Sequence, residues 1–224
     1  MITKRHFLVC FVGMDGTGKT TQTKRLVSAL NARGINSKYV WNTYQPFLLK
    51  PFIALGQALF LRKKDAFKDY SGYSQSKHGI FKNRFLSWSY QHLLLLDYWL
   101  QSVVSIMVPL ILGKTVVSDR YVYDVVANLA VDMGYSEEII RKRVRRLLLL
   151  LPKPDLVFFL DAPEEISFQR KSDIASIEHL KNRRKIYLDM AKDARAVVVD
   201  GSKTPDEVES IVHGELKQAG VNIL

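Results

Sequence analysis

Cysteine is nearly missing from this 224-residue chain, which contains only Cys10. One cysteine excludes an intrachain disulfide and a zinc site built from several thiolates, and it favours a reducing compartment. Acidic residues are also scarce, because 22 Asp and Glu stand against 33 Lys and Arg, for a formal net charge of +11. This balance predicts an anionic partner, which could be a nucleic acid, an acidic membrane surface or a polyphosphate small molecule.

Signals for a leader, a membrane span and a second domain are also weak. The apolar run 7–12 passes directly into a glycine-rich stretch, which argues against a signal peptide. The longest apolar stretch, 93–112, is interrupted by an Asp, a Gln and a Pro, so we expect a core helix rather than a bilayer span. Because there is no repeat and no Ser/Gly linker, we expect one domain over residues 1–224. The weak leader and membrane signals, with the single cysteine, predict a soluble, cytoplasmic protein.

The pattern of apolar residues predicts an α/β fold. Short β-branched runs predict strands at 6–12, 37–41, 114–119, 155–161 and 196–200. Longer patterns predict helices at 19–33, 121–133, 136–151, 163–195 and 204–219, with a mostly helical stretch before residue 112. Continuous apolar strands are typical of a parallel sheet that helices cover on both faces. We therefore expect three layers around a central parallel sheet of about five strands.

A phosphate-binding motif follows the first predicted strand. Residues 13–20 read GMDGTGKT and satisfy the P-loop pattern G-x-x-x-x-G-K-[ST]. Glycines let the backbone turn and aim its N–H groups at phosphates, and the following helix adds its positive dipole end. Lys19 would reach the β- and γ-phosphates, and Thr20 would coordinate Mg²⁺. The predicted ATP-binding residues are Gly13, Met14, Asp15, Gly16, Thr17, Gly18, Lys19, Thr20 and Thr21, and the predicted fold is that of a P-loop NTPase.

Four sequence blocks share an order and spacing with one enzyme family. They are 11–22, which contains the loop, 116–121 (VVSDRY), 153–165 (KPDLVFFLDAPEE) and 197–201 (VVVDG). Together they resemble the thymidylate kinases. The resemblance implies an ATP- and Mg²⁺-dependent nucleoside monophosphate kinase that converts dTMP and ATP to dTDP and ADP. It also implies a homodimer.

The VVSDRY block supplies a candidate metal residue and a candidate phosphate residue. An Asp at the end of a buried strand beside a phosphate loop can hold Mg²⁺, and an adjacent Arg can bind a phosphate. Asp119 and Arg120 fit these roles, although the alternative is an ion pair that only caps the following helix. Asp15 is similar to the family's loop Asp, which lies near the acceptor sugar and the metal.

The resemblance also implies a catalytic Arg, which the family carries either in the loop or in a lid. Loop position 16 is Gly, so the lid must supply this residue. The candidates are Arg170 and Lys171, at the start of a possible short lid over 170–180. The predicted catalytic residues are Asp15, Lys19, Arg120 and Arg170.

The acceptor side departs from the family pattern. Tyr44-Gln45-Pro46 replaces the usual Arg-Glu-Pro, and Leu94 and Tyr98 replace an aromatic residue and, four residues later, an Arg. The predicted acceptor-binding residues are Tyr44, Gln45, Tyr98, Arg120, Tyr121 and Asp124, with a possible loop over this pocket at 62–78. The missing cations leave an alternative, a P-loop kinase whose acceptor is a nucleoside or small metabolite without a phosphate.

Two basic runs have no assigned partner. Residues 141–146 hold five cations, which on a helix would form a solvated face opposite an apolar stripe. The run 181–185 follows the predicted lid, where its charge could reach phosphates. We therefore expect no nucleic-acid partner, and a nucleic-acid-associated ATPase is the least favoured function.

Overall fold

The computed structural model describes residues 6–47, 50, 84–170 and 177–221. Its five strands are β1 (Leu8–Gly13), β2 (Ser37–Trp41), β3 (Thr115–Asp119), β4 (Leu156–Asp161) and β5 (Val197–Asp200). They form one sheet in the order β2-β3-β1-β4-β5, and every neighbouring pair is parallel. This confirms the predicted parallel sheet and the position of each predicted strand.

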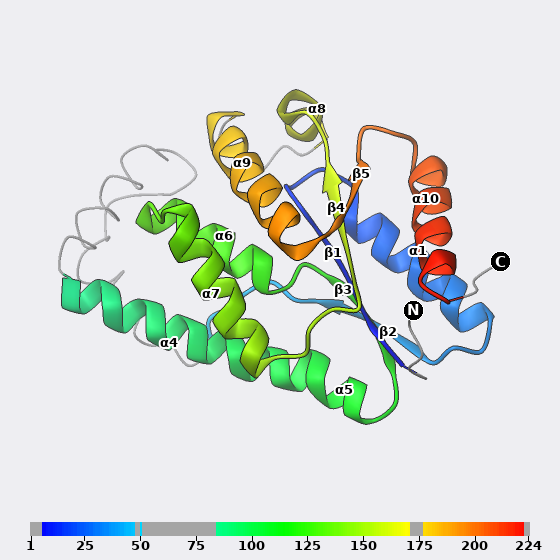
Figure 1. The fold of residues 1–224 in the computed structure, drawn as a ribbon, viewed down its shortest axis with the longest axis horizontal. Coiled ribbons are helices and arrows are strands. Elements are labelled where there is room, and N and C mark those ends of the chain that lie inside the picture. The colour runs from blue at the N-terminus through cyan, green and yellow to red at the C-terminus, as the bar shows by residue number, and fades with distance from the viewer. Residues whose placement is uncertain (1–5, 48–49, 51–83, 171–176, 222–224) are drawn as a thin grey trace.

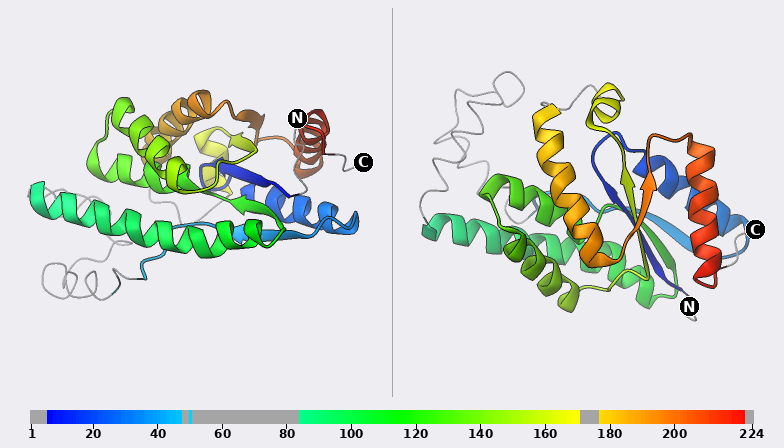
Figure 2. Two further views of the ribbon diagram at one scale, coloured as in Figure 1. Left: turned by 60° about the horizontal axis from the view of Figure 1, so that its bottom comes forward. Right: turned by 45° about the horizontal axis from the view of Figure 1, so that its top comes forward.

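Helices cover both faces of the sheet, as Figures 1 and 2 show. The first of these layers consists of α1 (Lys19–Ala32) and α10 (Pro205–Gln218). The second contains α4 (Arg84–Ser102), α6 (Val122–Met133), α7 (Glu137–Leu150) and α9 (Ile177–Ala194). The shorter η1 (Val103–Met107) and α5 (Val108–Ile111) continue α4, and α8 (Glu164–Gln169) follows β4. The three-layer P-loop fold is therefore confirmed.

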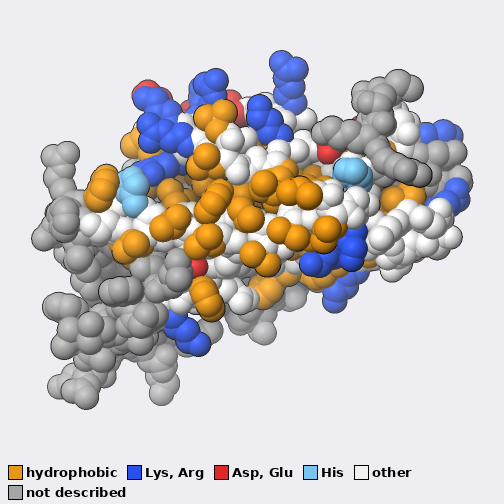
Figure 3. All heavy atoms as spheres, turned by 90° about the horizontal axis from the view of Figure 1, so that it is seen from below, with side chains coloured by type: hydrophobic (Ala, Val, Ile, Leu, Met, Phe, Trp, Pro, Cys, Tyr) orange, Lys and Arg blue, Asp and Glu red, His pale blue; other side chains and the backbone are white. Residues whose placement is uncertain are grey.

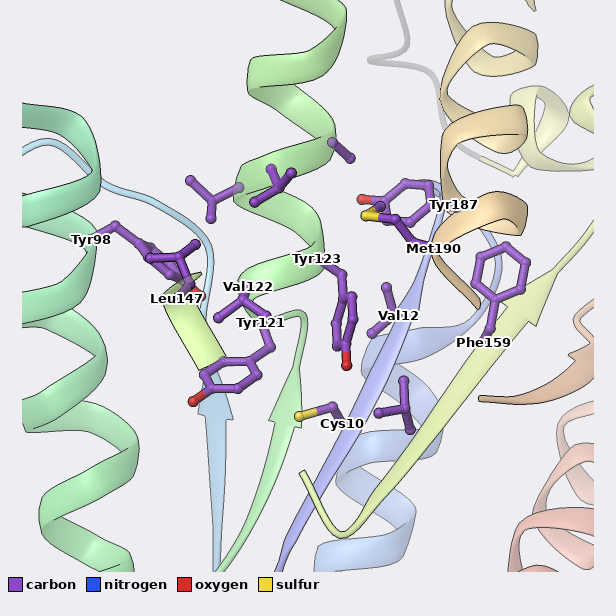
Figure 4. Packing of buried hydrophobic residues seen from close by; sticks show 14 of the residues in the cluster. Cys10, Val12, Tyr98, Tyr121, Val122, Tyr123, Leu147, Phe159, Tyr187 and Met190 are labelled. Atoms are coloured by element: carbon purple, nitrogen blue, oxygen red, sulfur yellow. The ribbon is translucent and has the colours of Figure 1, made fainter. Parts of the chain in front are cut away.

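Alternation along β1 places the core on both faces of the sheet. Leu8, Cys10 and Val12 join a cluster with residues of α4, α6, α7 and α9, whereas Val9 and Phe11 join a second cluster with α1 and α10. Figure 4 shows Tyr123 and Tyr187 in the first cluster. Burial of β1 on both faces explains why its run is apolar throughout.

The expected core helix at 93–112 is buried along one side only. Leu94, Tyr98 and Ile106 lie in the core, whereas Val104 is 69% exposed and Ile111 is 70% exposed. Pro109, which has no N–H to donate, lies in the first turn of α5, directly after the π-helical turn η1. By length and composition alone, the helical segment Trp88–Ile111 is apolar enough to cross a membrane.

Helix α7 carries the basic run 141–146. Its Ile140 and Leu147 are buried, and the side chains of Arg141 and Lys142 are 56% and 63% exposed. Both cations pair with carboxylates one turn earlier, at Glu137 and Glu138. The solvated face that the sequence predicted is therefore confirmed.

Some segments named in the sequence lie outside the described residues. The possible acceptor loop at 62–78 is one of them, and so are residues 171–176 of the possible lid. The last four lid residues, 177–180, form the first turn of α9.

Two neighbouring valines of β5 provide a stability test. Val199 is 1% exposed and Val198 is 56% exposed. Val199→Ala should lower the free energy of unfolding by about 2 kcal/mol, because it removes two buried methyl groups. Val198→Ala, the matched control, should change it by less than about 0.5 kcal/mol. Urea denaturation measures both, and equal losses would contradict the one-sided burial of β5.

Candidate active site

The phosphate loop lies between β1 and α1 and is shaped by glycines in the left-handed region. Gly16 has a φ of 84°, and a Cβ at this position would lie 2.5 Å from the carbonyl oxygen of Ser167 in α8. Helix α8 therefore packs directly on the loop. No side chain fits at position 16, so an Arg at this loop position would require α8 to move.

The loop opens into a cavity of about 740 Å³. Its cationic lining residues are Lys19, Arg120, Arg170 and Lys203. The other lining residues come from the phosphate loop, the start of α1, β2, the segment that joins β5 to α10, and the start of α10. This size and charge suit a nucleoside triphosphate.

Lys19 is buried at the base of this cavity. Its Nζ donates a hydrogen bond to the carbonyl oxygen of Met14. Burial, together with the nearby charge of Arg120, lowers the pKa of Lys19 to about 7. A bound polyphosphate would stabilise the charged form and raise that pKa again.

Thr20, in the first turn of α1, lies beside Asp119, at the end of β3, as expected for two residues of one metal site. The Thr20 hydroxyl donates to Asp119 Oδ2 at 2.5 Å. Asp119 Oδ1 is buried and has no hydrogen-bond partner among the described residues. Hydroxyl and carboxylate oxygens are hard ligands of the kind Mg²⁺ prefers, and an unpartnered buried oxygen has capacity for one more. These two residues therefore fit the predicted metal.

Four charged residues of the phosphate loop and its neighbouring elements pair with one another. We call Asp15, Arg120, Asp124 and Arg183 the charge cluster. Arg120 donates to the carboxylates of both Asp15 and Asp124. Arg183 of α9 adds contacts of 3.3 Å to Asp124 and 3.7 Å to Asp15. The hydroxyl of Tyr187 donates to Asp124 at 2.5 Å. The structure thus brings together three residues predicted from the sequence.

Sequence reasoning did not single out Arg183 or Tyr187 as site residues. The only signal was the basic run 181–185 beside the predicted lid, and it did not distinguish one cation from another. Their spacing of four residues places both on one face of α9. Their common partner, Asp124, lies 59 and 63 residues away in the chain, so no local pattern reveals the contact.

Arg120 adopts a strained backbone. Its φ of 72° lies in the left-handed region, which non-glycine residues rarely occupy. The Ser118 hydroxyl donates to the Arg120 carbonyl at 2.6 Å, and the Arg120 N–H donates to Phe11 at 2.8 Å. Such strain persists where several contacts fix the conformation, and it is common at functional sites.

Arg170, the predicted catalytic lid residue, lies at the C-terminal end of α8. It donates to the carbonyl oxygens of Gly201 at 2.7 Å, Ser202 at 3.3 Å and Gly16 at 3.5 Å. Its guanidinium therefore joins the phosphate loop to the segment after β5. Its catalytic role stays a prediction, and the other candidate, Lys171, lies outside the described residues.

A second cavity, of about 290 Å³, lies on the predicted acceptor side, and we call it the acceptor cavity. Its described lining residues come from α4, α6, α9 and the segment after β2, and are Tyr44, Tyr90, Leu94, Val125, Asn128, Leu129, Val131, Asp132 and Arg183. Arg183 therefore belongs both to this cavity and to the charge cluster. The acceptor cavity is thus adjacent to the phosphate loop.

The predicted acceptor residues occupy different environments. Tyr44 lines the acceptor cavity, whereas Gln45 is exposed. Tyr98 and Tyr121 lie in the core, where their hydroxyls donate to Asn42 and to the carbonyl oxygen of Pro152. Neither is among the residues that line the two cavities. Their role in acceptor binding stays a prediction.

Asp97 is a buried acid that the sequence did not single out as a site residue. Its carboxylate accepts the backbone N–H of Phe47 at 2.8 Å and the Tyr44 hydroxyl at 3.4 Å. It thereby fixes the segment after β2 against α4. This contact positions Tyr44 at the acceptor cavity.

Comparison with known proteins identifies similar sequences. The family model described as thymidylate kinase matches residues 80–212, which is more than half of the chain. A probable thymidylate kinase of Methanocaldococcus jannaschii is 28% identical over 95% of this chain and 96% of its own length. Thymidylate kinases of Sulfurihydrogenibium sp. and Leptospira borgpetersenii are 29% and 27% identical, over 96% and 93% of this chain and 98% and 92% of their own.

The low pKa of Lys19 predicts proton uptake when Mg-ATP binds. At pH 8 a group with a pKa of about 7 is mostly neutral, and the phosphate charge should restore the cation. Calorimetry in two buffers of different ionisation enthalpy should therefore show uptake of most of one proton at pH 8 and much less at pH 6. Lys19→Met should remove the uptake. Equal uptake in this variant would show that another group takes the proton.

Proposed function

Because this chain belongs to the thymidylate kinase family, we propose that it transfers the γ-phosphoryl group of ATP, with Mg²⁺, to a nucleoside monophosphate. The favoured acceptor is dTMP, which gives dTDP and ADP. The observation that carries this proposal is the phosphate loop in one cavity with Lys19, Arg120 and Thr20, whose hydroxyl donates to the buried Asp119, adjacent to the acceptor cavity. The names of the full-length relatives support the choice of acceptor.

Catalysis in this proposal is positioning and charge stabilisation. The loop N–H groups and Lys19 would hold the β- and γ-phosphates, and Arg120 would contact the transferring group. Thr20 and Asp119 would hold Mg²⁺, which supplies charge neutralisation at the phosphate oxygens when bound. The attacking atom would be an oxygen of a monophosphate that is already ionised near neutral pH, so no side chain is required as general base.

A second candidate is a kinase whose acceptor carries no phosphate. The specific observation is the charge balance of the charge cluster, where Asp15 and Asp124 already pair with Arg120 and Arg183. In addition, Tyr98 of α4 stands where the family pattern has an Arg. A nucleoside, a sugar or another small alcohol would need a hydroxyl site rather than a phosphate site.

The proposal includes a homodimer that buries the outer side of α4, η1 and α5. Figure 3 shows this side, where apolar side chains gather and few acidic ones appear. Its exposed apolar residues in these elements include Trp88, Leu93, Leu96, Leu100, Val104, Val108 and Ile111. Contiguous apolar surface of this extent is typical of an interaction site, and a second copy of the chain presents a matching surface. A cytoplasmic location is also part of the proposal, supported by the single free Cys10.

An ADP-release assay over dTMP, other nucleoside monophosphates, thymidine and small alcohols tests the activity. We expect a clear preference for dTMP, and we expect Lys19→Ala to lower turnover by at least about 100-fold, because a buried phosphate contact is lost. Lys217→Ala, at an exposed position of α10, is the control and should keep wild-type turnover. A preference for thymidine over dTMP would replace the proposal with the second candidate, and wild-type turnover in Lys19→Ala would exclude both.

Light scattering after size exclusion tests the homodimer. The wild-type protein should have twice the mass of one chain, and the double variant Val104→Lys, Ile111→Lys should have the mass of one chain, because two charges would enter an apolar interface. Val198→Lys introduces a charge at an exposed position of β5 and should leave the dimer intact. A monomeric wild-type protein would contradict the proposed interface.

A further inference from the structure

Arg183 is the only cation among the described residues that line the acceptor cavity. It projects from α9, and its side chain is 10% exposed. One Nη atom lies 3.3 Å from Asp124 and the other lies 3.7 Å from Asp15 of the phosphate loop. A single guanidinium therefore spans the distance between the acceptor cavity and the loop.

The hydrogen-bonding capacity of Arg183 is not filled. Its Nε is buried and has no partner among the described residues. Guanidinium groups offer five donors in a planar fork that matches phosphate, and buried donors are normally satisfied. Arg120 also directs its Nη groups at carboxylates, but its contacts are closer than the 3.3 Å and 3.7 Å contacts of Arg183. Arg183 is therefore held by longer ion pairs and has a donor that the described residues do not satisfy.

The described lining residues that α4 contributes to the acceptor cavity are Tyr90 and Leu94, and neither is a cation. Tyr98 turns its hydroxyl toward Asn42 in the core. Asp97, which precedes Tyr98 in the chain, is an acid whose carboxylate accepts hydrogen bonds from the Tyr44 hydroxyl and the backbone N–H of Phe47. An anionic group in the acceptor cavity would therefore meet its charge partner on α9.

We infer that Arg183 binds the phosphate of the acceptor, and that Asp124 holds its guanidinium in place until the acceptor arrives. This inference rests on the proposed function, because it assumes a monophosphate acceptor. Contact with phosphate would be charge-assisted and could be bidentate. Arg183 would be the charge partner of the acceptor phosphate, which no described lining residue of α4 supplies.

Asp124 can release Arg183 without losing all of its own partners. It also accepts a hydrogen bond from Tyr187 at 2.5 Å and from Asn128 at 3.5 Å, and it remains paired with Arg120. Burial, with the nearby Asp124, raises the pKa of Tyr187, so its hydroxyl stays protonated and remains a donor. The exchange of a carboxylate for a phosphate on Arg183 therefore leaves no orphaned acid.

The competing explanation is that Arg183 only ties α9 to α6 through Asp124. Calorimetric dissociation constants for dTMP and thymidine distinguish the two, because these ligands differ only in the phosphate. The wild-type protein should bind dTMP more tightly than thymidine. Arg183→Gln should weaken dTMP binding by roughly 10-fold or more, with little change for thymidine or for ATP.

Three companion variants keep the test decisive. Arg183→Lys retains the charge without the fork and should fall between wild type and Arg183→Gln. Lys192→Gln, the matched control, removes a cation at an exposed position of the same helix and should leave the preference for dTMP unchanged. Asp124→Asn removes the carboxylate that competes for Arg183, so dTMP should bind more tightly than to wild type. Thermal unfolding of each variant verifies that it is folded.

Two results would overturn the inference. Equal loss of dTMP and thymidine binding in Arg183→Gln, or weaker dTMP binding in Asp124→Asn, would show a structural role alone. In either case the wild-type protein would still convert dTMP, and the proposed function would stand. A wild-type protein that binds dTMP no better than thymidine would instead overturn both the inference and the proposed acceptor.

Discussion

The pairing of two arginines with two aspartates holds the active site together. Arg120 follows β3, Asp15 lies in the phosphate loop, Asp124 lies in α6 and Arg183 lies in α9, so the charge cluster fixes four elements relative to one another. The carboxylate of Asp124 and the guanidinium of Arg183 are buried, and removal of one member would leave an uncompensated charge. Asp15 and Arg120 line the first cavity and Arg183 lines the second, so in the proposed function a transferred phosphoryl group would pass beside the cluster.

Strand order explains why this cluster forms where it does. In the parallel sheet β1 lies between β3 and β4, and Phe11 of β1 is level with Asp119 of β3. The carboxyl ends of adjacent parallel strands meet at one edge, so the loop after β1 and Asp119–Arg120 at the end of β3 become neighbours although about a hundred residues separate them. The same geometry brings the Thr20 hydroxyl to the Asp119 carboxylate. In the proposed function, backbone topology would therefore supply the ATP site, and side chains of α4, α6 and α9 would form the acceptor side.

The sequence was sufficient for the parts of the site that rest on local patterns. The glycine spacing of 13–20 predicted the loop, and apolar runs predicted all five strands. Contacts between distant helices leave no such pattern, which is why the sequence did not single out Arg183 and did not indicate that Tyr98 is buried in the core. The exposed side of α4, η1 and α5 was likewise hidden, since a helix that is apolar all round gives no indication of which side other elements cover.

A crystal structure with a bisubstrate ligand, adenosine and thymidine joined by five phosphates, tests the role of the charge cluster most directly. The structure described above predicts that the adenosine-side phosphates lie on the backbone of the loop and that the thymidine-side phosphate lies within about 3 Å of Arg183. The contact between Arg183 and Asp124 should be lengthened, while Tyr187 stays on Asp124. A thymidine-side phosphate remote from Arg183, with the Arg183–Asp124 contact unchanged, would contradict this role.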